Sequence, residues 1–275
     1  MAGVSGESLS TALAELQARL PGASLALAQE LFGILGTVDS SAGLRRALTD
    51  PSRSAAEKST LVSALVRGKV SAEAEIIVGQ LASSRWSAAR DLGDALETLA
   101  ATVAIAVAEN RAAADASGIT GLEQLENDLF DFNRTVEASH DVQGALAEPQ
   151  AAGAAKTALA LRLVPSAGEE ARLLISQSVL NPRGVKPTKL VERFATLAAQ
   201  RQQRWIATVT VSRPLTQQQQ KRLQTGLDSL YGRELKVNMS VDPALIGGVR
   251  VRVGDEVVDA SVITRLGELR RQLAG

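Results

Sequence analysis

The residues that could do chemistry lie mostly near the C-terminal end of the chain. Asp255 and Asp259 form a carboxylate pair of the kind that serves acid–base catalysis. Gly247 and Gly248 form a glycine pair of the kind found in phosphate-binding loops. No lysine follows these glycines at the required spacing, and no complete phosphate-loop motif occurs anywhere in the sequence. We therefore interpret the glycines as a bulge or a point of close packing, and the aspartates as a turn residue and a helix N-cap.

The other reactive residue types are scarce. His140 is the single histidine, and it belongs to no catalytic motif with a serine, a cysteine or a second histidine, so we expect it on the surface. Cysteine is absent, which excludes disulfides, thiolate catalysis and cysteine-ligated zinc. Arg250 and Arg252 share one face of a predicted strand, where they could meet acidic residues of a partner or simply face solvent. The sequence thus predicts no catalytic, cofactor-binding or metal-binding residue.

The composition is that of a globular protein, since 45% of the 275 residues are hydrophobic and 22% are charged. The 30 basic and 30 acidic residues cancel, so net charge gives no argument for nucleic acid or anionic lipid. From Arg201 onward there are 12 basic and 7 acidic residues, which fits either a mildly basic docking face or an ordinary solvated surface. The uncharged run from Thr98 to Ala108 is shorter than the about 20 residues of a membrane helix, so we expect no direct membrane insertion.

A shift of 98 residues aligns the sequence with itself over two long segments without a gap. About twenty identities fall in roughly 75 aligned positions. They include Leu27 with Leu125, Leu31 with Leu129, Phe32 with Phe130, Pro51 with Pro149, Lys58 with Lys156 and Arg85 with Arg183. Helical periodicity alone can align leucines, but it does not easily align a proline, a lysine and an arginine in one register. The sequence therefore predicts a tandem duplication.

Both copies carry apolar stripes at helical spacing. Leu61 and Leu65 belong to such a stripe in the first copy, and Leu159 and Leu163 repeat it in the second. Proline and glycine separate the stripes, because proline lacks a backbone donor and glycine admits positive φ. We expect each copy to be a bundle of about five or six short helices.

The hydrophobic period changes after Trp205 from helical to alternating. Strands are predicted over residues 206–211, 235–241, 249–253 and 256–258, with a helix over 215–231. Gly254 and Asp255 suit the two-residue turn of the last hairpin. The predicted fold is therefore mostly α, with two tandem short-helix bundles followed by a small α+β C-terminal domain.

A terminal amphipathic helix is predicted over residues 260–274. Its apolar stripe consists of Val262, Leu266, Leu269 and Leu273. This stripe could pack against a partner or inside its own domain, since a terminal helix often does both.

Residues 241–266 resemble the C-terminal signature of ATP synthase delta subunits, the family that includes the mitochondrial oligomycin-sensitivity-conferring protein. The matching positions that we take as the signature are Asp242, Pro243, Gly247, Gly248, Arg252, Gly254, Asp255, Asp259, Ser261 and Arg265. They span about 25 positions with several fixed spacings, which makes the resemblance specific. The sequence departs from the usual family pattern in carrying the helical bundle twice, a trait associated with actinobacterial members.

The resemblance implies a non-catalytic stator connector of the rotary, proton-translocating ATP synthase, without a cofactor and without nucleic acid. A helical bundle would hold the N-terminal helix of an alpha subunit, and the C-terminal domain would hold the C-terminal helices of b-type stalk subunits. Candidate stalk contacts are Val262, Leu266, Leu269 and Leu273. The chain would then lie at the cytoplasmic face of the plasma membrane as a peripheral component of the complex.

On this basis we expect the extra bundle over residues 1–108, the family's N-terminal domain over 109–205 and the stalk-binding domain over 206–275. A general helical-repeat adaptor with an appended α+β module is the alternative. An enzyme whose site is assembled from scattered residues is a third hypothesis, which nucleotide binding or hydrolysis by the pure chain would favour. Which copy docks on the head stays open.

Overall fold

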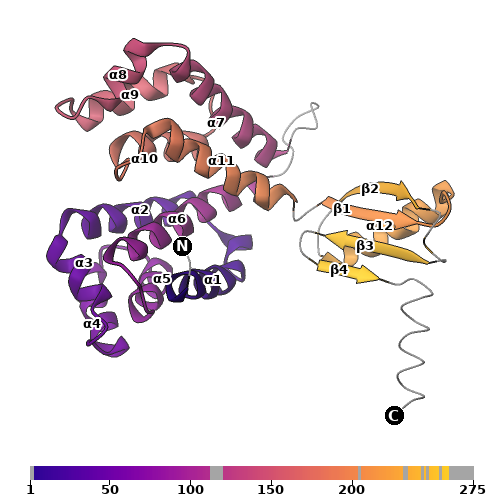
Figure 1. Cartoon of the computed structure of the whole chain (residues 1–275), viewed down its shortest axis with the longest axis horizontal. Coiled ribbons are helices and arrows are strands. Elements are labelled where there is room, and N and C mark those ends of the chain that lie inside the picture. The colour runs from indigo at the N-terminus through magenta and orange to yellow at the C-terminus, as the bar shows by residue number, and fades with distance from the viewer. Residues whose placement is uncertain are drawn as a thin grey trace. The chain divides into compact units, whose positions relative to one another are not determined.

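The computed structural model describes residues 3–111, 120–203, 206–231, 235–242, 245, 248–253 and 256–259. The chain divides into two compact units, residues 1–198 and 199–275 (Figure 1). The described part of the first unit is built from helices, and the described part of the second is a sheet with a helix. The observed fold class is the predicted one, mostly α with a small α+β unit at the C-terminal end.

Short helices make up the first unit. They are α1 (Val4–Gln17), η1 (Leu20–Gly22), α2 (Leu25–Ser40), α3 (Ala42–Thr49), α4 (Ala55–Val66), α5 (Ala72–Ser83), α6 (Ala89–Asn110), α7 (Gly121–Glu137), α8 (His140–Ala147), α9 (Gly153–Leu163), α10 (Glu169–Leu180) and α11 (Pro187–Gln203), whose residues from 199 onward fall in the second unit. Many begin at a serine or threonine whose side chain accepts a hydrogen bond from a backbone N–H of the first turn. Ser24, Ser41, Ser54, Ser71, Thr120 and Ser139 cap helices in this way.

The helix boundaries repeat with the shift found in the sequence. Adding 98 to the bounds of α3, 42 and 49, gives the bounds of α8, 140 and 147. The same shift places the starts of α2, α4, α5 and α6 within two residues of the starts of α7, α9, α10 and α11. A tertiary contact repeats as well, because Glu30 and Asp128 each accept a backbone hydrogen bond at the beginning of α5 or α10, from Ser71 and Gly168 respectively. The two bundles are therefore structural copies.

Helix α6 belongs to both copies. Its first half corresponds to the beginning of α11, whereas position 102 within it corresponds to position 4, where α1 begins. It packs against α1, α2, α3 and α5 of the first bundle and against α7 and α10 of the second. Alanine, valine and leucine are buried around most of its circumference, as expected for a helix enclosed on all sides. One continuous helix thus closes the first bundle and opens the second.

The leucine stripe predicted on α4 and α9 is only partly buried. Leu61, Leu159 and Leu163 are half-buried, and Leu65 is 36% exposed. The core-facing residues are instead their neighbours Val62 and Ala160, which are almost fully buried. The helical spacing located the helices correctly, but these short outer helices direct the residues one position further along, Val62 and Ala160, toward the core.

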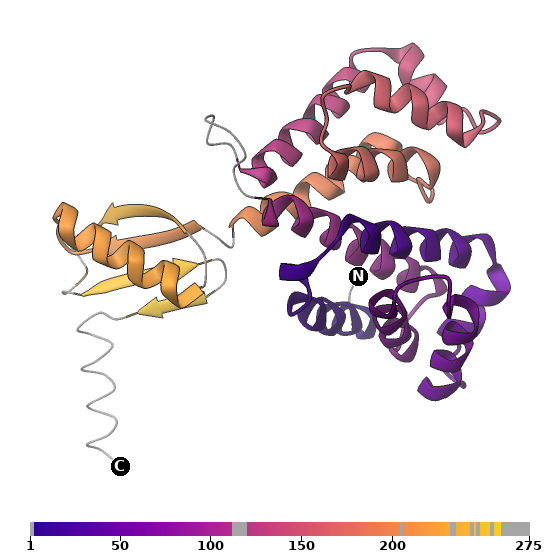
Figure 2. The ribbon, with the colours of Figure 1, turned by 180° about the vertical axis from the view of Figure 1, so that it is seen from behind.

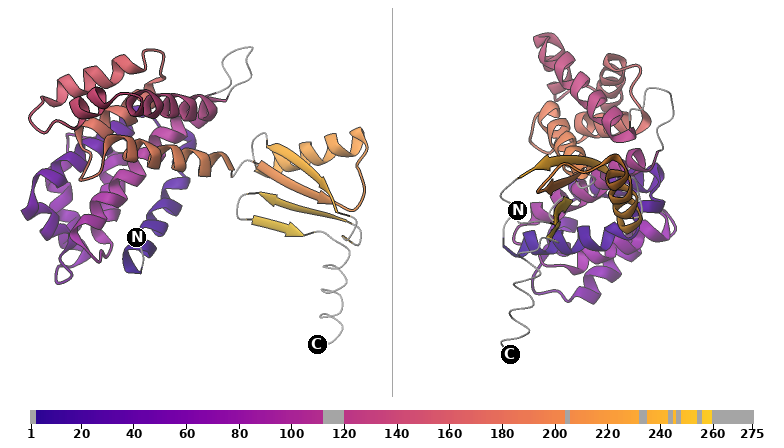
Figure 3. Two further views of the ribbon diagram at one scale, coloured as in Figure 1. Left: turned by 45° about the horizontal axis from the view of Figure 1, so that its top comes forward. Right: turned by 90° about the vertical axis from the view of Figure 1, so that its right-hand side faces the viewer.

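The second unit is a four-stranded sheet with one helix. Its elements are β1 (Ile206–Val211), α12 (Gln217–Tyr231), β2 (Lys236–Val241), β3 (Val249–Val253) and β4 (Glu256–Asp259), in the order β2-β1-β3-β4. Strand β1 pairs parallel with β2 and antiparallel with β3, and β3 pairs antiparallel with β4. Helix α12 makes the crossover between the parallel strands and lies along one face of the sheet (Figures 2 and 3).

Alternating apolar residues build the core of this unit. Val209 and Val211 of β1 and Val251 and Val253 of β3 are buried together with Leu227 of α12. The predicted strands and helix are confirmed to within two residues at each end. The terminal helix predicted over 260–274 lies outside the described residues. In the part of the chain that the structure describes, no helix is both long enough and apolar enough to cross a membrane.

Candidate partner-docking surfaces

Two of the signature residues that the structure describes, Asp242 and Gly248, lie in the connection between β2 and β3. Asp242 continues the parallel pairing, since its N–H donates to the carbonyl of Val211 at 2.9 Å, and its own carbonyl accepts from the N–H of Leu245 at 3.1 Å. Gly248 has φ of +82°, a left-handed conformation that favours glycine. Asp242 and Gly248 therefore shape the backbone of this turn, and the bulge or close packing predicted for the glycine pair stays a prediction.

The outer face of the sheet carries the predicted arginines. Arg250 and Arg252 are exposed on β3, while Val251 and Val253 between and beside them are buried. Asp259 ends β4 opposite Arg250 in the antiparallel register. The other named positions lie outside the described residues: Pro243, Gly247, Gly254, Asp255, Ser261, Arg265 and the stripe Val262, Leu266, Leu269 and Leu273.

Both edges of the sheet expose large apolar side chains. Met239 and Val241 on edge strand β2 are 41% and 49% exposed, and Val257 on edge strand β4 is 57% exposed. Leu230 on α12 is 69% exposed. Apolar side chains at sheet edges and on a helix give this unit several positions at which a partner chain could bury surface.

A groove of about 590 Å³ opens in the first bundle between α1, α4 and α5. Its walls are mostly small or polar, with Ser59, Ser63 and Gly79 among them, and Ile76 contributes a large apolar side chain that is 45% exposed. Glu15 and Glu75 flank the groove. Small side chains along its walls leave room for another chain to approach closely.

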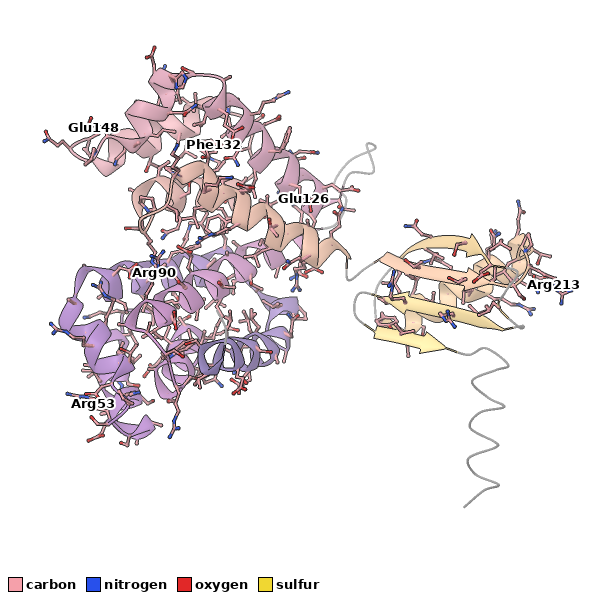
Figure 4. All side chains as sticks on the ribbon, viewed as in Figure 1. Arg53, Arg90, Glu126, Phe132, Glu148 and Arg213 are labelled. Carbon is pink, nitrogen blue, oxygen red and sulfur yellow. The ribbon has the colours of Figure 1, made fainter. Side chains whose placement is uncertain are left out.

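A buried charge cluster joins the two bundles. Arg183, in the turn between α10 and α11, reaches the first bundle, where its Nε lies 2.7 Å from Asp39 Oδ2 and its Nη1 lies 2.7 Å from Asp94 Oδ1 and 3.7 Å from Glu97 Oε1. The Arg183 side chain is only 10% exposed. Arg90 Nη2 donates to the Arg183 carbonyl at 3.1 Å, and Figure 4 places Arg90 at the boundary between the two sets of helices.

The backbone and the electrostatics of this cluster are both adapted to Arg183. Arg183 has φ of +52° and is followed by Gly184 with φ of +82°, so the turn is held in a left-handed conformation that costs energy for arginine. A side chain at Gly93 of α6 would collide with the guanidinium. Burial raises the pKa of Glu97, and the nearby Arg183 opposes that shift. The positive charge of Arg183 therefore offsets the energetic cost of placing three carboxylates in a largely buried position.

Two phenylalanines complete the contact between the bundles. Phe32 of α2 packs edge-to-face on Phe194 of α11, with ring centroids 6.4 Å apart and an interplanar angle of 63°. Phe32 and Phe194 are 4% and 1% exposed. This aromatic pair and the Arg183 cluster make the two bundles a single packed unit. Sequence comparison had shown Arg183 only as a repeat of Arg85, and its place after Pro182 and before Gly184 was the available signal for a special turn.

Within the described ranges, no group of three or more histidine, aspartate or glutamate side chains is placed to hold a metal ion. His140 lies exposed in the first turn of α8, as predicted. The described residues form a groove in the first bundle, apolar edges of the sheet and a closely packed pair of bundles. These features define a modular protein made of duplicated helical bundles and an α+β module.

The chain belongs to the ATP synthase delta (OSCP) subunit family, whose sequence model matches residues 101–273. A protein named ATP synthase subunit delta from Pseudarthrobacter chlorophenolicus is 73% identical over 275 residues, covering 100% of both chains. Proteins of the same name from Renibacterium salmoninarum and Thermobifida fusca are 67% and 38% identical, again over 100% of both chains. A chain of the Toxoplasma gondii mitochondrial ATP synthase hexamer is similar at a TM-score of 0.34 and 20% identity, covering 64% of this chain and 95% of its own, which is too distant to carry an argument.

The family match begins where the second copy begins. Its first residue, 101, directly precedes position 102, which corresponds to the first residue of α1 in the repeat. The family match therefore covers the second copy, including the C-terminal half of α6, together with the C-terminal unit. The first copy lies outside the family model, yet the actinobacterial relatives align across it.

Proposed function

We propose that this chain is a static connector of the rotary ATP synthase, joining the catalytic head to the peripheral stalk and resisting torque. Family membership carries this proposal, because the match covers the second bundle and the C-terminal unit together, and relatives named ATP synthase subunit delta match the whole length. The chain contributes adhesion and stiffness rather than a reactive group. A connector under torque needs slow dissociation from its partners, which large and well-packed contacts provide.

The two ends of the chain divide the work in this proposal. The helical unit binds the N-terminal helix of an alpha subunit, and the C-terminal unit binds the C-terminal helices of b-type stalk subunits. Three functional modules follow: the extra bundle (1–108), the family bundle (109–205) and the stalk module (206–275), with α6 crossing the first boundary. The chain acts at the cytoplasmic face of the plasma membrane as a peripheral subunit, held there by its partners.

The signature residues have a structural task in this scheme. Asp242 and Gly248 shape the β2–β3 connection, and Arg250 and Arg252 offer positive charge on the outer face of the sheet to acidic stalk residues. The stripe formed by Val262, Leu266, Leu269 and Leu273 makes the stalk contact itself. The groove between α1, α4 and α5 gives the extra bundle a place for a second helix of the head.

The test is an affinity purification of the tagged chain from its native cells. We expect the full chain to retain both alpha and b-type subunits, and the variant lacking residues 260–275 to retain the alpha subunit alone. Retention of b-type subunits by the shortened variant would refute the assignment of the terminal segment. Absence of every ATP synthase subunit from the full-chain sample would refute the connector function.

A further inference from the structure

One equivalent surface is buried in the first copy and exposed in the second. In the first copy, Phe32 of α2 is 4% exposed because the second copy covers it, through the edge-to-face contact with Phe194. The repeat-equivalent residue of the second copy is Phe130 of α7, and it is 66% exposed. A single exposed phenylalanine is ordinary on a protein surface. What sets Phe130 apart is the set of residues retained around it.

The acidic partners of the interface are retained in the same register. Asp39 and Asp94 bind Arg183 in the first copy, and their equivalents in the second copy are Glu137 of α7 and Glu192 of α11. Phe130 and Glu137 are seven residues apart, as Phe32 and Asp39 are, so each pair lies two helical turns apart on one face. The second copy thus keeps the apolar anchor and two of the three carboxylates of a surface that in the first copy binds a phenylalanine and an arginine.

The differences between the copies show how an occupant would sit. Gly93, which makes room for the Arg183 guanidinium, is replaced by the buried Val191, so a cation cannot enter as deeply. Lys189 Nζ lies 2.5 Å from Glu192 Oε2 and close to Glu137, so its positive charge already neutralises part of the negative charge of these two glutamates. Buried Ala28 and Leu35 of α2 are replaced in α7 by Glu126 and Asn133. The contact on the second copy is therefore shallower and more polar than the internal one.

Charge favours a basic occupant. The solvent-facing side of α7 carries Glu123, Glu126, Asp131 and Glu137, against Arg134 as the basic residue of that helix, and Arg134 is paired with Asp131 at 2.9 Å. Figure 4 shows Glu126 on α7. Burial raises the pKa of Glu126, and the neighbouring Glu123 adds a smaller contribution in the same direction. A chain with no net charge has therefore gathered acidic residues around one exposed aromatic ring.

We propose that the exposed face of α7, defined by Phe130, Glu137 and Glu192, docks an amphipathic helix of another subunit of the assembly. That helix presents one large apolar side chain to Phe130 and an arginine or lysine, about two turns away, to Glu137 and Glu192. It reproduces from outside the contact that Phe194 and Arg183 make within the chain. This inference rests on the proposed connector function, because the partner is a neighbour in the complex.

The experiment places the photocrosslinking residue p-benzoylphenylalanine at position 130 of the full chain, in the assembled complex from native cells. We expect irradiation to give one covalent adduct with another subunit. The same residue at Gln150, exposed in the turn between α8 and α9, is the control and should give no such adduct. A link within the same chain, a link to a second copy, or no link in an assembled complex would each overturn the inference. Failure of the full chain to retain any ATP synthase subunit would instead refute the proposed function.

Charge reversal tests the basic part of the occupant. In the chain labelled at position 130, Glu137→Lys should lower the adduct yield by about fivefold, the effect expected from replacing one exposed ion pair by repulsion. Glu148→Lys makes the same charge change elsewhere on the bundle, at an exposed residue, and should leave the yield unchanged. Equal losses in the two variants would show that only overall charge matters and would overturn the proposed pairing.

Discussion

The first and second bundles share one fold but differ in what covers them. The first bundle has its Phe32 face buried by the second, with an aromatic pair and a buried arginine between them. The second bundle ends the array and shows the equivalent face to its surroundings, with polar residues at two formerly buried positions. Terminal repeats of stacked arrays are generally altered in this way, because their outer face meets water. Positions on this face that keep the residue of the first copy, above all Phe130, are therefore the ones that point to a binding partner.

The largest expected difference concerns the paired phenylalanines. Phe32→Asp should lower the free energy of unfolding by about 5 kcal/mol, because it removes a buried ring and places an unpaired charge between the bundles. Phe130→Asp should change it by no more than about 0.5 kcal/mol, because the ring is exposed. Chemical denaturation of the two variants measures the contrast. Similar losses in both would mean that the copies do not use this face differently.

The Arg183 cluster should give the next largest effect. Arg183→Ala leaves Asp39, Asp94 and Glu97 without their shared cation, and since Asp39 and Asp94 are partly exposed we expect a loss of about 3 kcal/mol at neutral pH. Gly93→Ala should disturb the same contact sterically and cost about 1–3 kcal/mol. Gly33→Ala is the matched control on α2, where a side chain meets nothing, and it should be neutral or stabilising.

Glu97 gives this cluster a pH dependence with a defined sign. Its pKa in the folded chain is raised above 4.5, so the folded state binds its proton more tightly than the unfolded state does. The stabilisation from this group is complete below pH 4.5 and is lost as the pH rises through the raised pKa. Glu97→Gln should remove this part of the pH dependence, which denaturation across that window measures. An unchanged pH profile in the variant would show that Glu97 does not titrate in this way.

Much of the fold followed from the sequence, and the contact between the copies did not. The period of the apolar residues located the helices and strands, and the identities at a shift of 98 revealed the duplication, because both signals are local or repetitive. The role of Arg183 depends on Asp39 and Asp94, which lie far away in sequence, so no local pattern shows it. The exposure of Phe130 was equally hidden, since the repeat aligns it with Phe32, which is buried. Sequence identity between repeats reports shared ancestry, whereas burial depends on which neighbour follows.

The smallest expected difference concerns the first residue of one helix. It tests whether the second copy has also lost stability at a helix N-terminus. In the first copy Ser54 caps α4 with a complete capping box: the Ser54 hydroxyl accepts from the Glu57 backbone N–H, and the Glu57 carboxylate accepts from the Ser54 backbone N–H. The equivalent residue of the second copy is Ala152, which caps α9 without any side-chain bond. Restoring the cap by Ala152→Ser should stabilise the chain by about 0.5–1 kcal/mol, and Ser54→Ala should destabilise it by about 1 kcal/mol. Thermal unfolding measures both shifts. If Ala152→Ser brings no gain, the start of α9 is satisfied by other means, and the two copies differ in their caps without differing in the stability that the caps provide.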